Sequence, residues 1–108
     1  MVYSISEIQQ RIAPVARRYG LRAVFLFGSY ARGTANEHSD IDLLIDTTGT
    51  PIKSLLQLGA VYSDLEAALE KPVDLITVSA LEQRASGSHD LRFRQAVERE
   101  RRPVYVAA

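Results

Sequence analysis

Three short apolar runs constrain the fold of this chain more than any other feature. They lie at residues 22–27 (RAVFLF), 40–45 (DIDLLI) and 73–78 (VDLITV). Their length and their content of Val, Ile and Phe are typical of buried β-strands. Segments with helical periodicity separate them. Helices that alternate with strands predict an α/β or α+β fold, in which one sheet packs against flanking helices.

Two segments, one before the first strand and one between the second and third strands, have the pattern of amphipathic helices. A capping-box pattern at Ser4 and Glu7 precedes apolar residues at helical spacing, which predicts a helix over 5–19. Pro14 interrupts this pattern, so that either a kink or two shorter helical pieces are compatible with it. A second helix is predicted over 52–70.

The remaining segments are shorter or more polar. One or two helical turns are predicted over 29–32, and a polar loop over 33–39. After Ser79 a charged, helix-prone segment follows, with an interruption at Gly87. Its alternating charges indicate a solvated helix face rather than an RNA site. The last run, at 103–106, is predicted to be a short edge strand.

Length and composition limit the class of protein. The 108 residues are a common size for one domain, which we expect to span residues 1–108. Thirteen basic residues balance thirteen acidic ones, so direct nucleic-acid binding is not expected. The absence of cysteine excludes disulfides and thiolate metal sites. The apolar runs are too short to span a membrane, and we expect a soluble, cytoplasmic protein.

Asp40 and Asp42 are the first candidate functional residues. At this spacing in a strand, side chains point to the same face, with Cβ atoms about 6.6 Å apart, so two carboxylates reach one ion. Ligand sets made of oxygen alone favour Mg²⁺ or Mn²⁺ over zinc. If strand 73–78 lies beside strand 40–45, Asp74 is about 4.8 Å away laterally and completes a three-carboxylate, two-metal site. Taken singly, a D-x-D pair is common, and a lone acid near a strand end is often solvated.

Gly28, Ser29 and Arg32 connect the acids to phosphate chemistry. A glycine after a strand lets the backbone approach a ligand, and the following helical turn offers unpaired N–H groups to anionic oxygens. Ser29 adds a hydroxyl, and Arg32 adds a guanidinium suited to phosphate. A purely structural interpretation is a helix capped by Ser29 and ended by Gly33.

The string GSYARGTANEHSDID resembles the G-S-x10-D-x-D signature of the DNA polymerase β-type nucleotidyltransferase superfamily. Its "ARG" and "SDIDLL" segments also resemble the minimal nucleotidyltransferase (MNT) group. The resemblance extends over nearly the whole chain, and KPVDLITV stands where the third carboxylate of the family is expected. It implies the polymerase β-like nucleotidyltransferase fold, with a small mixed sheet and flanking helices.

The resemblance also implies an activity and roles for residues. The activity is transfer of a nucleotidyl group from a nucleoside triphosphate, ATP by resemblance, to an acceptor hydroxyl. Asp40, Asp42 and Asp74 are then the catalytic, metal-binding residues for two Mg²⁺ ions, and Asp74 serves the acceptor. The nucleotide-binding residues are Gly28, Ser29 and Arg32.

The size of the chain led us to expect that another protein presents the acceptor. The resemblance to MNT proteins of this size implies an antitoxin that pairs with a HEPN-domain RNase toxin and transfers AMP to a tyrosine of that partner. We therefore expect an AMPylating antitoxin in a hetero-oligomer with a HEPN toxin. Two alternatives remain open: a non-catalytic antitoxin that acts by binding alone, and a nucleotidyltransferase for a small-molecule hydroxyl.

Overall fold

The computed structural model describes residues 2–83 and 88–108. Along the chain the elements are α1 (Ile5–Tyr19), β1 (Ala23–Phe27), α2 (Gly28–Arg32), β2 (Ile41–Asp46), α3 (Leu55–Leu69), β3 (Val73–Thr77), α4 (Val78–Gln83), α5 (Ser88–Glu100) and β4 (Arg102–Val106). The predicted helices and strands are therefore present, with ends that differ by a few residues. The expected interruption at Gly87 lies outside the described residues.

The four strands form one mixed sheet in the order β3-β2-β1-β4. β2 and β3 are parallel, whereas β1 is antiparallel to both β2 and β4. β4 lies at an edge, as predicted, where Pro103 is tolerated although it has no backbone N–H to donate. The parallel pairing of β2 with β3 matters most for function, because it sets two acidic strands side by side.

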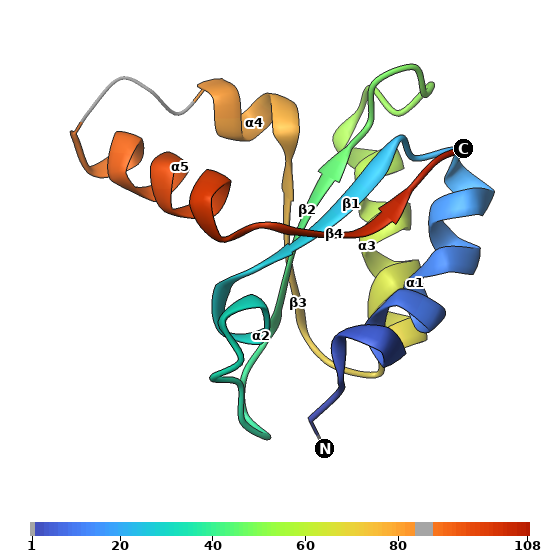
Figure 1. Ribbon diagram of the computed structural model, residues 1–108. Coiled ribbons are helices and arrows are strands. Elements are labelled where there is room, and N and C mark those ends of the chain that lie inside the picture. The colour runs from blue at the N-terminus through green and yellow to red at the C-terminus, as the bar shows by residue number, and fades with distance from the viewer. Residues whose placement is uncertain (1, 84–87) are drawn as a thin grey trace.

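Helices cover both faces of the sheet (Figure 1). α1 and α3 pack on one face over the larger core, which contains Leu26 and Leu43. α4 and α5 lie on the other face over a smaller cluster around Phe27, Leu44 and Val97. Since both faces are covered, neighbouring strand residues are buried on opposite sides, which explains why the strands read as continuous apolar runs.

α1 begins at the predicted capping box. The Ser4 side chain accepts a hydrogen bond from the Glu7 N–H (3.1 Å), and the Glu7 carboxylate accepts one from the Ser4 N–H (2.9 Å). Pro14 lies inside a single uninterrupted helix, so the alternative of two helical pieces is wrong. The carbonyl that loses its partner belongs to Gln10, which is exposed and within reach of water.

α3 begins three residues later than predicted because Ser54 caps it. The Ser54 hydroxyl accepts a hydrogen bond from the Gln57 N–H (3.1 Å). As a result Leu55 and Leu56 occupy the first turn and are 87% and 86% exposed, rather than packing in the core. No helix in the described part of the chain has the length and apolar character needed to cross a membrane.

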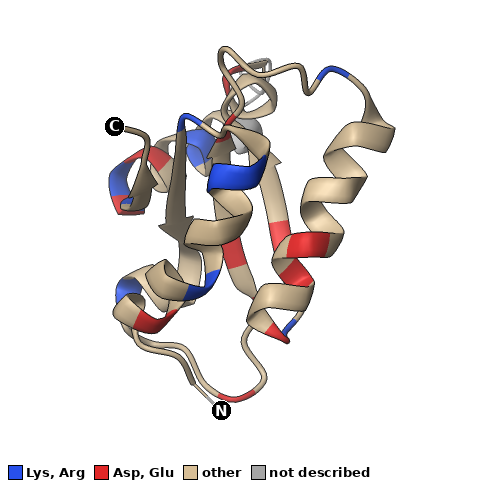
Figure 2. Cartoon of the chain, turned by 90° about the vertical axis from the view of Figure 1, so that its right-hand side faces the viewer, with Lys and Arg blue, Asp and Glu red and all other residues tan. Residues whose placement is uncertain are grey.

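Charges of both signs are interspersed on the side of the molecule that Figure 2 faces. This distribution agrees with the net charge of zero over the whole chain.

Candidate active site

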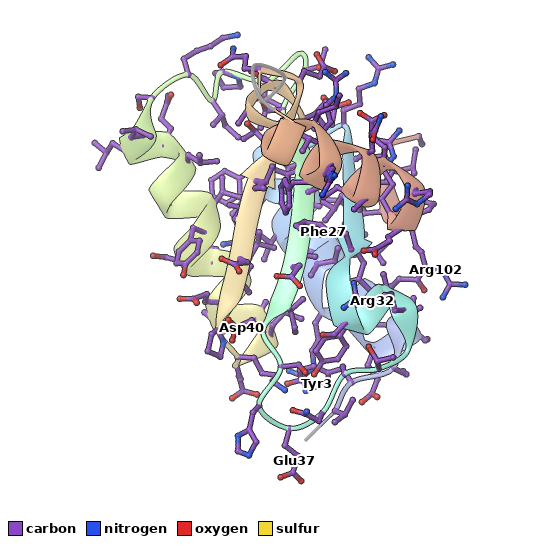
Figure 3. All side chains as sticks on the ribbon, turned by 90° about the vertical axis from the view of Figure 1, so that its left-hand side faces the viewer. Tyr3, Phe27, Arg32, Glu37, Asp40 and Arg102 are labelled. Carbon is purple, nitrogen blue, oxygen red and sulfur yellow. The ribbon has the colours of Figure 1, made fainter. Side chains whose placement is uncertain are left out.

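A cavity of about 530 Å³ lies on the α5 side of the sheet. Figure 3 looks onto this side, with Phe27 beneath α5 and Arg32 on α2. The walls come from the end of β1 with α2, from β2 and β3, and from α5. The lining residues are Phe27, Gly28, Arg32, Asp42, Asp74, Leu75, Ile76, Phe93, Ala96, Val97 and Glu100.

Asp42 and Asp74 form the acidic part of this cavity. They are direct partners in the parallel register of β2 and β3, so the predicted side-by-side placement of the two acids is present. Burial first, and then the negative charges of Asp74 and Asp40, raise the pKa of Asp42 to about 6, and a hydrogen bond with Asp74 acts in the same direction. Two acids this close ionise together only with difficulty, so the pair favours a cation or a shared proton.

Gly28 makes room for the Asp42 carboxylate. Its φ angle is 73°, in the left-handed region that glycine adopts without strain. A Cβ atom at this position would overlap Oδ2 of Asp42. The antiparallel register explains the contact, because Phe27 pairs with Asp42 and the next residue of the chain turns across the acid. The glycine is therefore required both by backbone conformation and by the neighbouring acid.

Asp40 is placed differently from the sequence prediction. β2 begins at Ile41, so Asp40 precedes the paired residues, and its side chain is exposed rather than held on the sheet beside Asp42. In Figure 3 it lies near the ends of β2 and β3 where these strands begin. Its charge still acts on Asp42. Within residues 2–83 and 88–108, no three acids or histidines lie close enough together to hold one metal ion.

The donor chemistry of Asp42 and Asp74 nevertheless fits a hard divalent cation. Magnesium is commonly held by one or two carboxylates, with water and phosphate oxygens completing its shell. Burial and the neighbouring acids raise the pKa of Asp42 more than the positive charge of Arg32 lowers it, and a bound cation would offset this excess of negative charge. These two residues would thus supply two of the oxygen ligands of one ion, and Asp40 would join them only by a change in its side-chain position.

Ser29 and Arg32 lie on α2, directly after Gly28. The helix is preceded by Phe27, which provides no side-chain cap, and it ends at Gly33 in a left-handed conformation. The purely structural interpretation is therefore wrong in assigning the N-terminal cap of this helix to Ser29. It is right in placing the end of the helix at Gly33. Ser29 is partly buried but does not line the cavity, whereas Arg32 does.

The opposite wall of the cavity is apolar and was not predicted as part of a site. Phe27 and Phe93 meet edge to face, with ring centroids 6.3 Å apart, and Ile76 and Val97 pack in the same cluster. Phe93 and Val97 lie on α5 and pack against residues of the sheet. Glu100 also lines the cavity, and the alternating charges around it gave no signal of this position.

Three other polar residues, Tyr30, His38 and Asp46, do not line the cavity. Tyr30 is buried, and its hydroxyl accepts a hydrogen bond from Lys71 Nζ (2.9 Å). His38 is exposed in the loop before β2. Asp46 ends β2 and accepts a hydrogen bond from the Thr48 N–H (3.0 Å), away from the cavity.

Comparison with known proteins identifies sequence relatives among the nucleotidyltransferases. Residues 9–104 match the family described as nucleotidyltransferase domain. A candidate protein adenylyltransferase of Methanocaldococcus jannaschii is 38% identical over 78 residues, which cover 72% of this chain and 82% of that protein. The protein adenylyltransferase MntA of Thermococcus cleftensis is 45% identical over 64 residues, covering 59% of this chain and 63% of its own length.

Solved structures share the fold. A crystal structure of a toxin-antitoxin with AMP-PNP superimposes with a TM-score of 0.66 at 27% identity, covering 92% of this chain and 73% of that one. A solved structure described as a candidate minimal nucleotidyltransferase superimposes with a TM-score of 0.64 at 32% identity, covering 88% of this chain and 87% of that one. The four-stranded mixed sheet with flanking helices is therefore the fold of minimal nucleotidyltransferases, as the sequence predicted.

Proposed function

The chain belongs to the nucleotidyltransferase domain family, and on this premise we propose that it transfers AMP from ATP to a tyrosine hydroxyl of a HEPN-domain toxin. The observation that carries the proposal is the contact of Gly28, Asp42 and Asp74 in one cavity. This contact places a tight strand-to-helix turn, which suits phosphate, beside a pair of acids, which suits a divalent cation.

The reaction needs few groups from the protein. The acceptor oxygen forms a bond to the α-phosphate, the bond from that phosphorus to the oxygen bridging the β-phosphate breaks, and pyrophosphate leaves. The hydroxyl proton must be removed, and we assign Asp74 to receive it. We assign the backbone of Gly28, the hydroxyl of Ser29 and the guanidinium of Arg32 to the triphosphate oxygens.

A metal completes the proposed site. Asp42 and Asp74 would hold magnesium, with Asp40 as the third carboxylate that the family signature implies. Bound magnesium would neutralise phosphate charge and favour ionisation of the acceptor. The cavity volume of about 530 Å³ leaves space for a nucleotide beside these acids.

The choice of ATP and of a toxin as acceptor rests on the relatives. The sequence relatives of this chain are named as protein adenylyltransferases, which act on proteins rather than on small molecules. A fold neighbour at 27% identity is a toxin-antitoxin with AMP-PNP. We therefore propose a hetero-oligomer in which the toxin presents its tyrosine to the cavity.

Incubation with ATP labelled in the α-phosphate, Mg²⁺ and the HEPN-domain toxin proposed as the partner tests the proposal. We expect label on a tyrosine of the partner, and none without Mg²⁺. Label in a low-mass product would favour a small-molecule acceptor. If an Asp40→Ala, Asp42→Ala double variant still neutralised the toxin while transferring nothing, binding alone would account for the antitoxin effect.

A further inference from the structure

One ion pair joins α5 to the phosphate-binding turn. Arg32 Nη1 donates hydrogen bonds to Oε1 and Oε2 of Glu100, at 3.2 and 3.1 Å. The two residues are 68 positions apart in sequence, on α2 and at the last residue of α5. Among the described residues, the Arg32 side chain makes only these two hydrogen bonds, both through Nη1. Its Nε and Nη2 donors therefore remain available to a ligand.

Both members of the pair line the cavity that contains the two acids. The guanidinium is close enough for its positive charge to act on Asp42, where it opposes the rise in pKa. The side chain of Arg32 is 49% exposed and that of Glu100 is 25% exposed. Arg32 is thus held at the mouth of the cavity, with one nitrogen engaged and its charge directed toward the site.

Local preference does not explain a glutamate at this position. Glu100 is the last residue of α5, where the helix dipole favours basic side chains over acidic ones. A carboxylate near a site for anionic phosphates also repels the ligand. Its contact with Arg32 is the stabilising interaction that the structure offers for it.

We propose that Glu100 is a positioning residue, which fixes Arg32 through one nitrogen so that the other guanidinium nitrogens face the phosphates of bound ATP. This inference rests on the proposed function. It assigns α5, which lies outside the motif that links Gly28 to Asp42, a part in nucleotide affinity. It also explains why Arg32 can pair with a carboxylate and still contact phosphate, because a guanidinium carries five N–H donors.

The alternative role for Glu100, competition with ATP for Arg32, predicts the opposite change in affinity for ATP. If Glu100 instead occupies the phosphate position on Arg32, it competes with ATP, and its removal tightens binding. If it positions Arg32, its removal frees a flexible side chain and weakens binding, although one negative charge has been lost. The sign of the change in affinity therefore separates the two roles.

Glu98 offers a matched control on the same helix. It accepts a hydrogen bond from Arg94 Nε (2.7 Å), but this ion pair lies within α5, and neither residue lines the cavity. Glu98→Ala and Glu100→Ala each remove one acid and one ion pair with arginine. Both variants lose one negative charge, but Glu100 lies in the cavity, so its removal relieves more repulsion of the phosphates, and electrostatics alone would favour tighter binding by Glu100→Ala. Weaker binding by Glu100→Ala than by Glu98→Ala therefore reports on the position of Arg32.

The test is calorimetric binding of Mg-ATP to the full chain, with thermal unfolding as a check on folding. We expect Glu100→Ala to raise the Kd roughly fivefold, as for loss of a partly exposed charged contact. Glu98→Ala should leave the Kd unchanged. Glu100→Gln, which keeps one oxygen acceptor, should fall between wild type and Glu100→Ala. In an Arg32→Ala background, Glu100→Ala should not weaken binding further.

Transfer kinetics give a second readout. A positioning role predicts a higher KM for ATP in Glu100→Ala, with kcat and melting temperature close to those of Glu98→Ala. Equal or tighter Mg-ATP binding by Glu100→Ala relative to Glu98→Ala would overturn the inference while leaving the proposed function intact. Conversely, a wild-type chain that binds Mg-ATP but labels no toxin would refute the proposed function, and the binding comparison would still decide the role of Glu100.

Discussion

The Asp42 carboxylate lies so close to the Cα atom of Gly28 that no side chain fits between them. This contact places the turn that follows β1 directly against the acid that β2 presents to the cavity. It links the conformation of the backbone to the position of a proposed metal ligand, and it leads to the first prediction.

Gly28→Ala should destabilise the chain and abolish nucleotide transfer, because the new methyl group must displace Asp42. Gly33→Ala is the matched control: its φ angle of 78° is similar, but a Cβ there meets nothing within 4 Å. Backbone strain alone costs about 1 kcal/mol in either variant, so chemical denaturation should show a larger loss for Gly28→Ala. Equal losses of stability and of activity in the two variants would contradict the contact.

Asp42→Asn should stabilise the metal-free chain at neutral pH while abolishing transfer. Asp42 binds its proton at a higher pH when folded than when unfolded, so wild-type stability falls as pH rises from 3.8 to about 6. A shift of this size corresponds to about 3 kcal/mol, which solvent screening reduces to roughly 1 kcal/mol. Urea denaturation with EDTA at several pH values measures this, and Asp42→Asn should remove the loss of stability between pH 3.8 and about 6 that comes from Asp42.

Asp46→Asn on the same strand should have the opposite effect on stability. Burial acts to raise the pKa of Asp46, but hydrogen bonds from Thr48 and the charge of Arg22 lower it on balance. The ionised form therefore stabilises the fold above the pKa, and this contribution is lost as pH falls through it. The same denaturation series should show lower stability for Asp46→Asn at neutral pH. A gain in stability would refute this assignment.

Magnesium binding should be linked to proton release from Asp42. Since a metal binds the ionised carboxylate, its affinity should fall as the pH drops below about 6, and binding there should release a proton. Calorimetric titration with Mg²⁺ in two buffers of different ionisation enthalpy measures the number of protons released. Affinity that stays constant across pH 6, with no proton released, would argue against Asp42 as a ligand.

Much of the fold followed from the sequence because local signals agreed with tertiary packing. The capping box at Ser4, the apolar runs and the edge strand with Pro103 all appear where they were predicted. The adjacency of Asp42 and Asp74 was also predictable, because it requires only that two acidic strands be neighbours in register. The position of Asp40 was not, since the point at which pairing begins depends on the loop before β2.

The remaining parts of the site depend on contacts that the sequence does not encode locally. The contact of Gly28 with Asp42 follows from the antiparallel register of β1 and β2. The pairing of Arg32 with Glu100 requires α5 to return across the sheet to α2. The spacing of charges along α5 distinguishes neither Glu100 from Glu98 nor a residue of the cavity from a solvated one.

Mass spectrometry of the partner toxin after incubation with this chain, ATP and Mg²⁺ tests the central claim most directly. We expect a mass increase of one or more AMP groups on a tyrosine of the toxin, lost with Asp42→Asn and with Asp74→Asn although both variants remain folded. An unmodified toxin in the presence of a folded, ATP-binding wild-type chain, or full modification by these variants, would contradict it.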